Sequence, residues 1–362
     1  MRLLIGAGGT GGGVYPALAV LQALTADADV LWVGAQGGIE SALVQRAGIA
    51  FEEIPAAGIH GVGLRRLPRN LGLLLRGLFA SRRIISHFKP DVILLTGGYV
   101  AFPVALAARR FPILLVVPDI EPGMALRTVA WFANCIAVSS EDSAKYFTNN
   151  KKILISGYPT RPELAKWDKS TARKQFNLQE TIPVLLIFGG SKGARSINQA
   201  VLDLLPSLLK IAQVIHISGE LDWPVVDTKR QELSTQENLR YHAFPYLHEE
   251  MGAALASADL VVSRAGASTL GEFPIHGLAA ILVPYPYAWR YQNVNAKYLA
   301  NRGAAVILED SKLGQQLFST IKQLLEDPSR LDSMRTAMKS LSHPFAADLI
   351  GQRLISMSGE RR

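Results

Sequence analysis

Residues 6–16 read GAGGTGGGVYP, and six of the first eight positions are glycine. The stretch follows the apolar run Leu3–Ile5 and precedes a helix-like segment, so it predicts a turn between a buried strand and a helix. Such a turn presents main-chain N–H groups and the positive end of the helix dipole, which together suit a diphosphate. The alternative is that the glycines serve only tight packing of strand against helix.

Two common nucleotide-binding motifs do not account for this stretch. Gly6, Gly8 and Gly11 have the spacing of the dinucleotide fingerprint, but the next strand-like run ends in residues 34–36 without an acid for a ribose diol, which disfavours NAD. A Walker A loop is excluded because no Gly-Lys-Ser/Thr follows. The stretch therefore predicts a diphosphate site of another kind.

A second loop of the same kind lies at residues 188–198, which read FGGSKGARSIN. It also follows an apolar run and precedes a helix-like one. Gly189, Gly190 and Gly193 permit close approach to the main chain, and the Ser191 hydroxyl adds a donor. Two such loops predict two phosphate-bearing substrates, or one long substrate.

Strand-like and helix-like runs alternate along both halves of the chain, which predicts an α/β fold with parallel, doubly wound sheets. A length of 362 residues favours two domains, expected over 1–157 and 158–342. The polar passage 156–183 is interpreted as the connection between them. Ligands of open parallel sheets bind beyond the carboxyl ends of the strands, so the expected site is a cleft between the two domains.

A third informative stretch is SRAGASTLGEFPIHG, residues 263–277. Glu272 falls one turn into a predicted helix, where a carboxylate can accept hydrogen bonds from a ribose diol, while Ser268 and Thr269 can cap the helix or reach a phosphate. A simpler explanation for Glu272 is that it complements the helix dipole, an effect of about 0.3–1 kcal/mol. Further on, Gln292 stands just before another helix-like segment, where an amide can contact sugar hydroxyls.

The net charge of +8 is concentrated in one segment. Residues 64–89 carry seven Lys or Arg and no acid, interleaved with leucines. This pattern fits a patch on an anionic membrane surface, and it fits equally an amphipathic core helix with a solvated basic face. Nucleic acid is disfavoured because no aromatic stacking pattern accompanies the charge. The apolar run at residues 92–108 is broken by glycines and a proline, so it predicts strand, turn and helix rather than a membrane span.

The cysteine and carboxylate content gives no metal or disulfide signature. A single cysteine, Cys135, excludes a disulfide framework and favours a reducing compartment. One Asp-x-Asp pattern, Asp27 to Asp29, lies away from both glycine loops and is interpreted as solvated. We therefore expect neither a metal nor another cofactor.

Taken together, these motifs resemble the MurG family of GT-B glycosyltransferases over nearly the whole chain. The resemblance rests on GGTGGGVYPALAV, KPDVILLTGGYVAFPVALAA, GYPTRPEL, GGSKGARSINQAV, SRAGASTLGEF and YQNVNAKYLANRGAA. It implies two Rossmann-like domains, with the last helix, 343–362, returning to the first. It also implies inverting transfer of N-acetylglucosamine from UDP-N-acetylglucosamine to the muramoyl 4-hydroxyl of the undecaprenyl-diphosphate acceptor lipid I, in peptidoglycan synthesis.

The resemblance also implies roles for individual positions. Substrate-binding roles fall on Thr10, Gly11, Gly12, Arg161, Ser191, His248, Ala267, Ser268, Thr269, Leu270, Gly271, Glu272 and Gln292. The first glycine loop would receive the acceptor diphosphate, and Ser191 and Arg161 the donor diphosphate. Glu272 would hold the ribose, Gln292 the sugar and the backbone of His248 the uracil. Residues 64–89 would form a membrane-facing patch, which implies a peripheral protein on the cytoplasmic side of the cell membrane.

The sequence departs from the family pattern where the base is expected. The family histidine of the first loop is replaced by Gly13, and its His-Glu-Gln-Asn run corresponds here to VVPD, ending at Asp119. An acceptor hydroxyl must lose its proton as it attacks, so the reaction needs a base. We expect Asp119 to take this role, with Glu121 as the second choice; the alternative for Asp119 is a helix cap.

Two other functions stay open at this level. The altered acceptor-side positions allow a GT-B enzyme that acts on another lipid, such as diacylglycerol. The missing histidine allows a nucleotide-sugar-binding protein without turnover.

Overall fold

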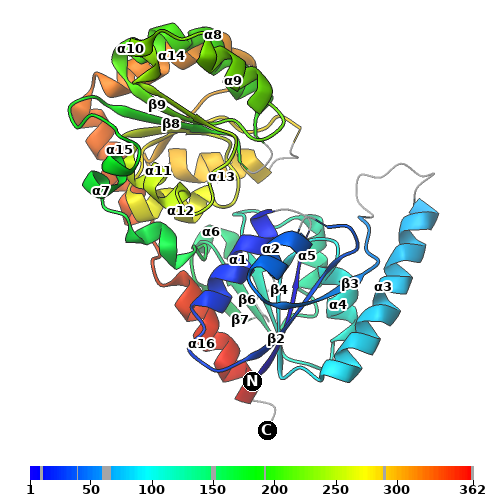
Figure 1. Ribbon diagram of the computed structural model, residues 1–362. Helices are drawn as coiled ribbons and strands as arrows, with labels where there is room; N and C mark the ends of the chain where they lie inside the picture. The colour runs from blue at the N-terminus through cyan, green and yellow to red at the C-terminus, as the bar shows by residue number, and fades with distance from the viewer. Residues whose placement is uncertain are drawn as a thin grey trace. The chain divides into compact units, whose positions relative to one another are not determined.

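The computed structural model describes residues 1–8, 11–38, 40–58, 67–147, 152–190, 193–287 and 291–359 (Figure 1). Thr10 and Ser191 lie outside the described residues, as does part of the basic segment. The chain divides into two compact units, one formed by Met1–Arg161 with His343–Arg362 and the other by Pro162–Ser342. Each unit holds one sheet in which the paired strands run parallel, so the predicted α/β class is confirmed.

The first unit is built on a seven-stranded sheet in the order β3-β2-β1-β4-β5-β6-β7. Its strands are almost continuously apolar and buried because helices cover both faces, as parallel sheets require. Its elements are β1 Arg2–Ala7, α1 Gly11–Gln22, β2 Asp29–Ala35, α2 Glu40–Arg46, β3 Ala50–Ile54, α3 Leu67–Phe88, β4 Val92–Gly97, α4 Ala101–Ala107, β5 Ile113–Val117, α5 Met124–Val129, β6 Cys135–Val138, α6 Glu141–Ala144, β7 Lys152–Ile155 and α16 Ala346–Gly359.

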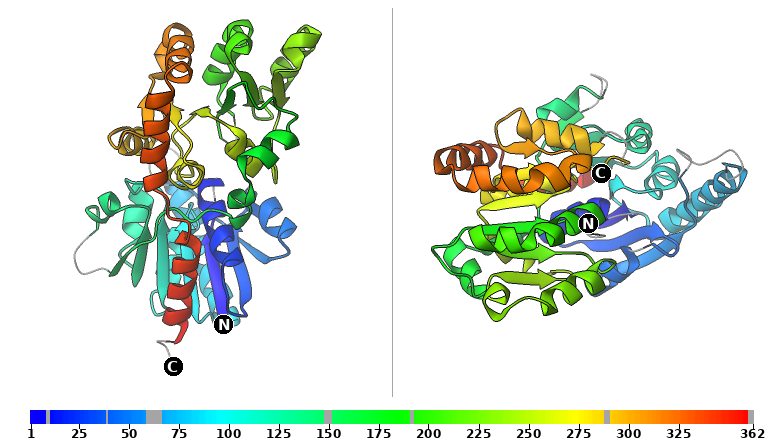
Figure 2. Two further views of the ribbon diagram at one scale, coloured as in Figure 1. Left: turned by 90° about the vertical axis from the view of Figure 1, so that its left-hand side faces the viewer. Right: turned by 90° about the horizontal axis from the view of Figure 1, so that it is seen from above.

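The helices of the first unit divide between the two faces of the sheet. On one face α1 and α16 pack over alternate strand residues, and Val14 and Leu354 belong to that core. On the other face α3, α4 and α5 cover the remaining strand residues, with Val104 at the centre. Figure 2 shows α16, in red, lying along the strands of this sheet. The helices that follow β1 and β4 thus leave toward opposite faces, which makes the boundary between these strands a topological switch point.

The second unit is built on a six-stranded sheet in the order β10-β9-β8-β11-β12-β13. Its elements are η1 Pro162–Lys166, α7 Lys169–Gln175, β8 Val184–Phe188, α8 Arg195–Ile211, β9 Gln213–Ile217, α9 Trp223–Gln231, α10 Thr235–Asn238, β10 Tyr241–Phe244, α11 Met251–Ser257, β11 Leu260–Ser263, α12 Thr269–His276, β12 Ala280–Leu282, α13 Tyr291–Ala300, β13 Ala305–Ile307, η2 Asp310–Lys312, α14 Leu313–Leu325 and α15 Pro328–Ser340.

The second sheet also has a switch point, between β8 and β11. After β8, α8 packs with α14 over the core that contains Ile187 and Leu205. Phe188 faces the other side, where its ring meets that of Phe273 in α12, with 6.0 Å between the centroids. The loops after β8 and β11 therefore diverge at adjacent strand ends, where ligands of such sheets bind.

The boundary between the units corrects one sequence interpretation. Residues 156–183 were expected to form a polar connection, but the first unit extends to Arg161 and the second begins at Pro162. Residues 156–160 are buried in the first unit, and residues 162–175 fold into η1 and α7. Several charged side chains of the passage, Lys169 and Arg173 among them, are paired inside the second unit.

The pairing centres on Asp259, which is 7% exposed at the start of β11. Its carboxylate accepts hydrogen bonds from Lys169 Nζ at 2.5 Å, Arg173 Nη2 at 2.7 Å and Arg335 Nη2 at 2.9 Å. It also accepts one from the main-chain N–H of Val184 at 2.8 Å. One carboxylate thereby joins α7 and α15 to the amino ends of β8 and β11.

We predict that Asp259→Ala lowers the free energy of unfolding by about 3–5 kcal/mol, because it leaves the buried Arg173 guanidinium without its carboxylate. Asp203→Ala on α8 is the matched control, since Asp203 is exposed and bonds to Gln199, and it should change stability by less than about 0.5 kcal/mol. Urea unfolding followed by circular dichroism measures both. Equal shifts for the two variants would show that the Asp259 cluster contributes no stability.

Candidate active site

At the switch point of the first unit, main chain packs directly on main chain. Gly98, in the loop after β4, has φ +80°, and a Cβ built on it would stand 2.3 Å from the carbonyl oxygen of Gly8. A side chain at Gly98 is therefore excluded both by the backbone conformation and by space. The turn after β1 is fixed against the turn after β4.

Glu40 explains why Gly8 lacks a side chain. Its side chain is fully buried, and its Oε1 accepts a hydrogen bond of 2.8 Å from the N–H of Ala35. A Cβ on Gly8 would lie 2.2 Å from this oxygen, and a Cβ on Gly38 would lie 2.4 Å from the same carboxylate. The sequence interpretation favoured a bound diphosphate as the cause of the glycine-rich stretch and left tight internal packing as the alternative. For Gly8 the cause is a carboxylate of the protein itself.

Position 13, where the family pattern has histidine, lies in the first turn of α1. The carbonyl oxygen of Gly13 accepts a hydrogen bond from Thr96 Oγ1. A Cβ at this position would stand 3.3 Å from the Gly8 carbonyl oxygen, tighter than an ordinary contact. The same close packing at the switch point thus favours glycine here. Gly11 and Gly12 begin the helix beside it.

The two candidate bases follow β5, two strands from β1 in the sheet and so about 10 Å from it. Asp119 is half-buried just beyond the strand. Glu121 is 3% exposed, and its Oε1 accepts a hydrogen bond of 2.9 Å from Arg127 Nη2. The Arg127 Nε also donates to the Pro122 carbonyl at 3.2 Å. Glu121 is thus paired with Arg127.

The phosphate-type loop of the second unit begins where β8 ends. Gly190 and Gly193 have φ of +89° and +75°, and the N–H of Gly193 donates to the Gly190 carbonyl at 2.9 Å. A Cβ on Gly193 would stand 2.2 Å from the carbonyl oxygen of Ser218. Both glycines are therefore required by the backbone turn that leads into α8.

A buried polar network lies beneath this loop. Asn198 Nδ2 donates to the Ser218 carbonyl at 2.8 Å, and Asn198 Oδ1 lies 3.0 Å from His216 Nε2. His216 Nδ1 lies 2.8 Å from the Tyr241 hydroxyl. Burial lowers the pKa of His216 to about 4, so the ring is neutral at pH 7. The network fixes the start of α8 to His216 in β9 and to Tyr241, the first residue of β10.

The third loop, residues 264–268, leads from β11 into α12. The Thr269 hydroxyl donates to the Gly266 carbonyl at 2.7 Å and its side chain is 2% exposed, so it stabilises the turn itself. Ala267, Leu270 and Gly271 are buried, whereas Ser268 and Glu272 are half-buried in the first turn of the helix. Among these predicted positions, Ser268 and Glu272 are the side chains that solvent reaches best.

Arg264 joins three segments of this site. Its Nη2 donates to Ser196 Oγ at 2.7 Å at the start of α8, and its Nη1 donates to Asp310 Oδ1 at 2.5 Å and to the Val283 carbonyl at 3.1 Å. Its guanidinium also lies over the Tyr285 ring, 5.2 Å from the centroid. A buried arginine therefore sets the relative positions of the loops after β8, β11 and β12.

Gln292 and its helix are attached to the same segments. Gln292 Oε1 accepts a hydrogen bond of 2.8 Å from the N–H of Tyr285. Asn295, one turn further along α13, donates from Nδ2 to the Ala265 carbonyl at 3.1 Å. The helix that carries Gln292 is thus attached to the loop that leads from β11 to α12.

His248 lies apart from this group. It follows β10, three strands from β11 in the sheet order, and is exposed with its ring centroid 4.6 Å from that of Tyr246. Both residues line a groove of about 510 Å³ that also includes His242.

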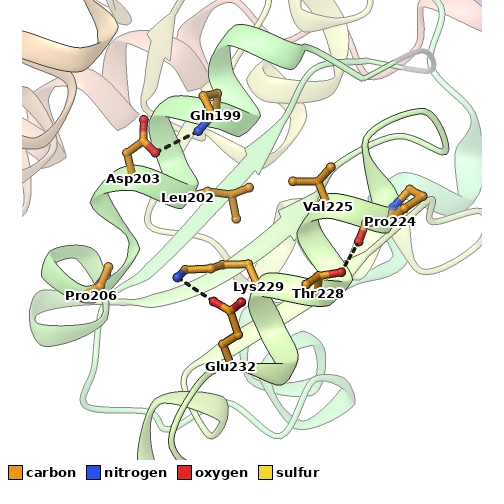
Figure 3. A pocket seen from close by; sticks show the side chains of 9 residues that line it. All are labelled: Gln199, Leu202, Asp203, Pro206, Pro224, Val225, Thr228, Lys229 and Glu232. Atoms are coloured by element: carbon orange, nitrogen blue, oxygen red, sulfur yellow. Dashed lines mark hydrogen bonds and ion pairs between the residues drawn. The ribbon is translucent and has the colours of Figure 1, made fainter.

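A second groove, of about 660 Å³ between α8 and α9, is lined by Leu202, Val225 and their neighbours (Figure 3). It contains none of the predicted site residues.

Arg161 belongs to the first unit, not to the second as the expected domain boundary had it. Its guanidinium carbon lies 4.8 Å from the centroid of the Tyr15 ring in α1.

Within the part of the chain that the structure describes, no three His, Cys, Asp or Glu side chains group as metal ligands do.

Sequence reasoning missed Glu40, Arg264 and Asn295. Arg264 and Asn295 bond to segments far along the chain, and Glu40 packs against Gly8 of an earlier turn. A single acid, arginine or asparagine carries no motif. The one available signal was position, since Arg264 directly follows an apolar strand-like run and precedes Gly266.

Comparisons with known proteins agree with this geometry. The model of the glycosyltransferase family 28 N-terminal domain matches residues 3–138, and that of the C-terminal domain matches residues 184–350. The UDP-N-acetylglucosamine--N-acetylmuramyl-(pentapeptide) pyrophosphoryl-undecaprenol N-acetylglucosamine transferase of Roseiflexus sp. (strain RS-1) is 40% identical, over 96% of this chain and 93% of that protein. The transferase of the same name from Desulforudis audaxviator (strain MP104C) is 38% identical over 99% of each.

The crystal structure of Acinetobacter baumannii MurG is similar to this chain with a TM-score of 0.75 at 26% identity, covering 98% of this chain and 99% of that one. This likeness, with the two parallel sheets, confirms the predicted GT-B fold. The chain therefore belongs to glycosyltransferase family 28 and, within it, to the MurG family of N-acetylglucosamine transferases.

Proposed function

We propose that this protein transfers N-acetylglucosamine from UDP-N-acetylglucosamine to the muramoyl 4-hydroxyl of lipid I, giving the disaccharide lipid of peptidoglycan synthesis. The observation that carries the proposal is the 40% identity, over 96% of the chain, to a transferase named for this donor and acceptor. The ordered loops of the second unit support it, because Arg264 and Asn295 fix the positions that would hold the donor.

In this proposal the second unit binds the donor. Glu272 accepts hydrogen bonds from the ribose hydroxyls, and Gln292 contacts the sugar. The turn at residues 267–271 and Ser191 lie near the phosphates, and Arg161, a residue of the first unit, adds its charge to that contact. The backbone at His248 contacts the uracil. The supporting feature is that Gln292 is hydrogen-bonded to Tyr285, and that Asn295 on the same helix is hydrogen-bonded to Ala265, just before the turn at residues 267–271.

The acceptor binds at the first unit in this proposal, with its diphosphate against Thr10, Gly11 and Gly12 at the start of α1. Asp119 removes the proton from the attacking hydroxyl, and the oxygen forms the new bond to the anomeric carbon as the bond to UDP breaks. Helix N-termini, main-chain N–H groups and Arg161 stabilise the charge that develops on the leaving UDP. Glu121, held by Arg127, supports the loop that carries Asp119.

We predict that Asp119→Asn lowers kcat for transfer to a lipid I analogue by about 10²–10⁴-fold, because the amide cannot accept the proton. The dissociation constant for UDP, measured by calorimetry, should change by less than about twofold, since Asp119 does not touch the donor in this proposal. Asp203→Asn on α8 is the control for a charge removed elsewhere. Unchanged kcat in Asp119→Asn would reject Asp119 as the base, and no transfer by the unaltered protein would reject the proposed reaction.

The exposed side of α3, the long cyan helix of Figure 1, supports binding to a membrane surface. Leu74 and Ile85 face the core, whereas Leu71, Leu75 and Phe79 are 52%, 51% and 64% exposed at successive turns. We call these three residues the α3 stripe. Arg69, Arg76, Arg82, Arg83 and Lys89 are exposed around it. An amphipathic core helix alone would explain the buried face but not the α3 stripe.

We infer that the α3 stripe and these cations place the protein peripherally on the cytoplasmic face of the cell membrane. Apolar side chains enter the headgroup boundary while arginines contact anionic lipids. Among the described helices, none is both long enough and apolar enough to span a bilayer.

We predict that Leu75→Ser with Phe79→Ser lowers binding to phosphatidylglycerol vesicles at least about tenfold in co-sedimentation, because each exposed side chain loses burial worth about 1.5–3 kcal/mol. Arg76→Glu with Arg83→Glu should weaken vesicle binding by a similar factor, because each cation removed costs about 1 kcal/mol of attraction to anionic lipids. Raised salt should weaken vesicle binding of the unaltered protein for the same reason. Leu239→Ser, at a site 61% exposed in the second unit, is the control. Binding that survives both double substitutions would exclude α3 as the membrane contact.

A further inference from the structure

A chain of hydrogen bonds runs from the core of the second unit to the surface at the start of α8. Asn198 Nδ2 donates both to the Ser218 carbonyl and to Asp222 Oδ2, each at 2.8 Å. Both partners can only accept, so the orientation of the amide is settled and its Oδ1 faces His216 Nε2. His216 therefore donates from Nε2 and accepts from the Tyr241 hydroxyl at Nδ1. The outer end of the chain is the Asp222 carboxylate, whose side chain is 14% exposed.

Asp222 holds an arginine at the surface. Its Oδ1 accepts a hydrogen bond of 3.2 Å from Arg195 Nε, and the Arg195 side chain is 83% exposed. The bond uses one of the five N–H donors of the guanidinium. Among the described residues, no protein group bonds to the terminal nitrogens Nη1 and Nη2 of Arg195. These nitrogens keep the planar fork of donors that matches two phosphate oxygens.

Stability does not explain an arginine at this position. Arg195 is the first residue of α8, which has no acid in its first turn and no side-chain cap at Ala194. A cation there meets the positive end of the helix dipole, which is unfavourable. An ion pair with one partner so exposed offsets little of this cost. A surface arginine that is held by a hydrogen-bonded chain from the core therefore indicates a role in binding.

Arg195 stands where the loops of the candidate donor site meet. Two residues before it, Gly193 packs closely on the Ser218 carbonyl, which belongs to the loop after β9. The next residue, Ser196, accepts a hydrogen bond of 2.7 Å from Arg264, which ties the start of α8 to the loop after β11. The loops after β8 and β11 are those that the proposed function sets against the donor diphosphate.

We propose that Arg195 binds the diphosphate of the nucleotide-sugar donor through its two terminal nitrogens, in the orientation that its bond to Asp222 sets. Arg195, Asp222 and the loops that would hold the donor all belong to the second unit. This inference rests on the proposed function, in which the second unit binds the donor. It adds to the diphosphate contact a cation that does not depend on the first unit.

The test is the affinity of the full-length protein for UDP and for uridine, measured by calorimetry. Arg195→Ala should raise the dissociation constant for UDP about ten- to hundredfold, because charge-assisted hydrogen bonds to the phosphates are lost, and leave that for uridine within about twofold. The matched control is Arg330→Ala, which removes an exposed arginine from the first turn of α15. That helix is joined to Asp259 at the amino ends of the strands, so the control should leave UDP affinity within about twofold.

Arg195→Lys separates an oriented contact from a diffuse effect of charge. Lysine keeps the charge but lacks the Nε bond and the planar fork, so UDP affinity should stay at least about threefold below that of the unaltered protein. Full recovery in Arg195→Lys, an equal loss for uridine, or unchanged UDP affinity in Arg195→Ala would each overturn the inference. Absent transfer by an unaltered protein that still binds UDP through Arg195 would instead overturn only the proposed reaction.

Discussion

Close packing of main chain on main chain at the ends of the strands is the constraint on which the candidate binding loops of each unit depend. In the first unit Gly98 packs on Gly8, and in the second Gly193 packs on the carbonyl of Ser218. The first contact lies where loops diverge to opposite faces of the sheet, and the second joins the loops that follow the neighbouring strands β8 and β9. In both places the backbone must turn sharply in little space. Buried polar side chains then hold these turns in place by hydrogen bonds. They are Glu40 in the first unit and Asn198 and Arg264 in the second.

The same constraint changes the meaning of the glycine-rich sequence. A glycine in such a loop indicates that some group approaches the backbone closely, but the sequence does not say whether that group belongs to a ligand or to the protein itself. At Gly8 it is Glu40 and the neighbouring turn. Around Gly266 a built Cβ would meet nothing within 4 Å, so that glycine is not explained by internal packing. The two kinds of glycine look alike in the sequence.

Alternating apolar runs and turn residues were enough to predict both parallel sheets, and the loops after β1, β8 and β11 were located correctly. What failed were contacts between distant residues. The polar passage at 156–183 was taken as a connection because the partner of Arg173 lies 86 residues away, at Asp259. In the candidate site, the ion pair between Glu121 and Arg127 joins residues only six apart, but it was not predicted either, since spacing alone does not show which way a loop side chain turns.

The return of α16 to the first unit bears on how the chain is made. Ile350, Leu354 and Met357 complete a core whose other members lie before residue 155, and they are separated from them by the whole second unit. During synthesis the earlier strands therefore leave the ribosome with part of one face uncovered, and the second unit can close first. The N-terminal half of this enzyme is finished last, although a chain usually folds its domains in the order in which they emerge.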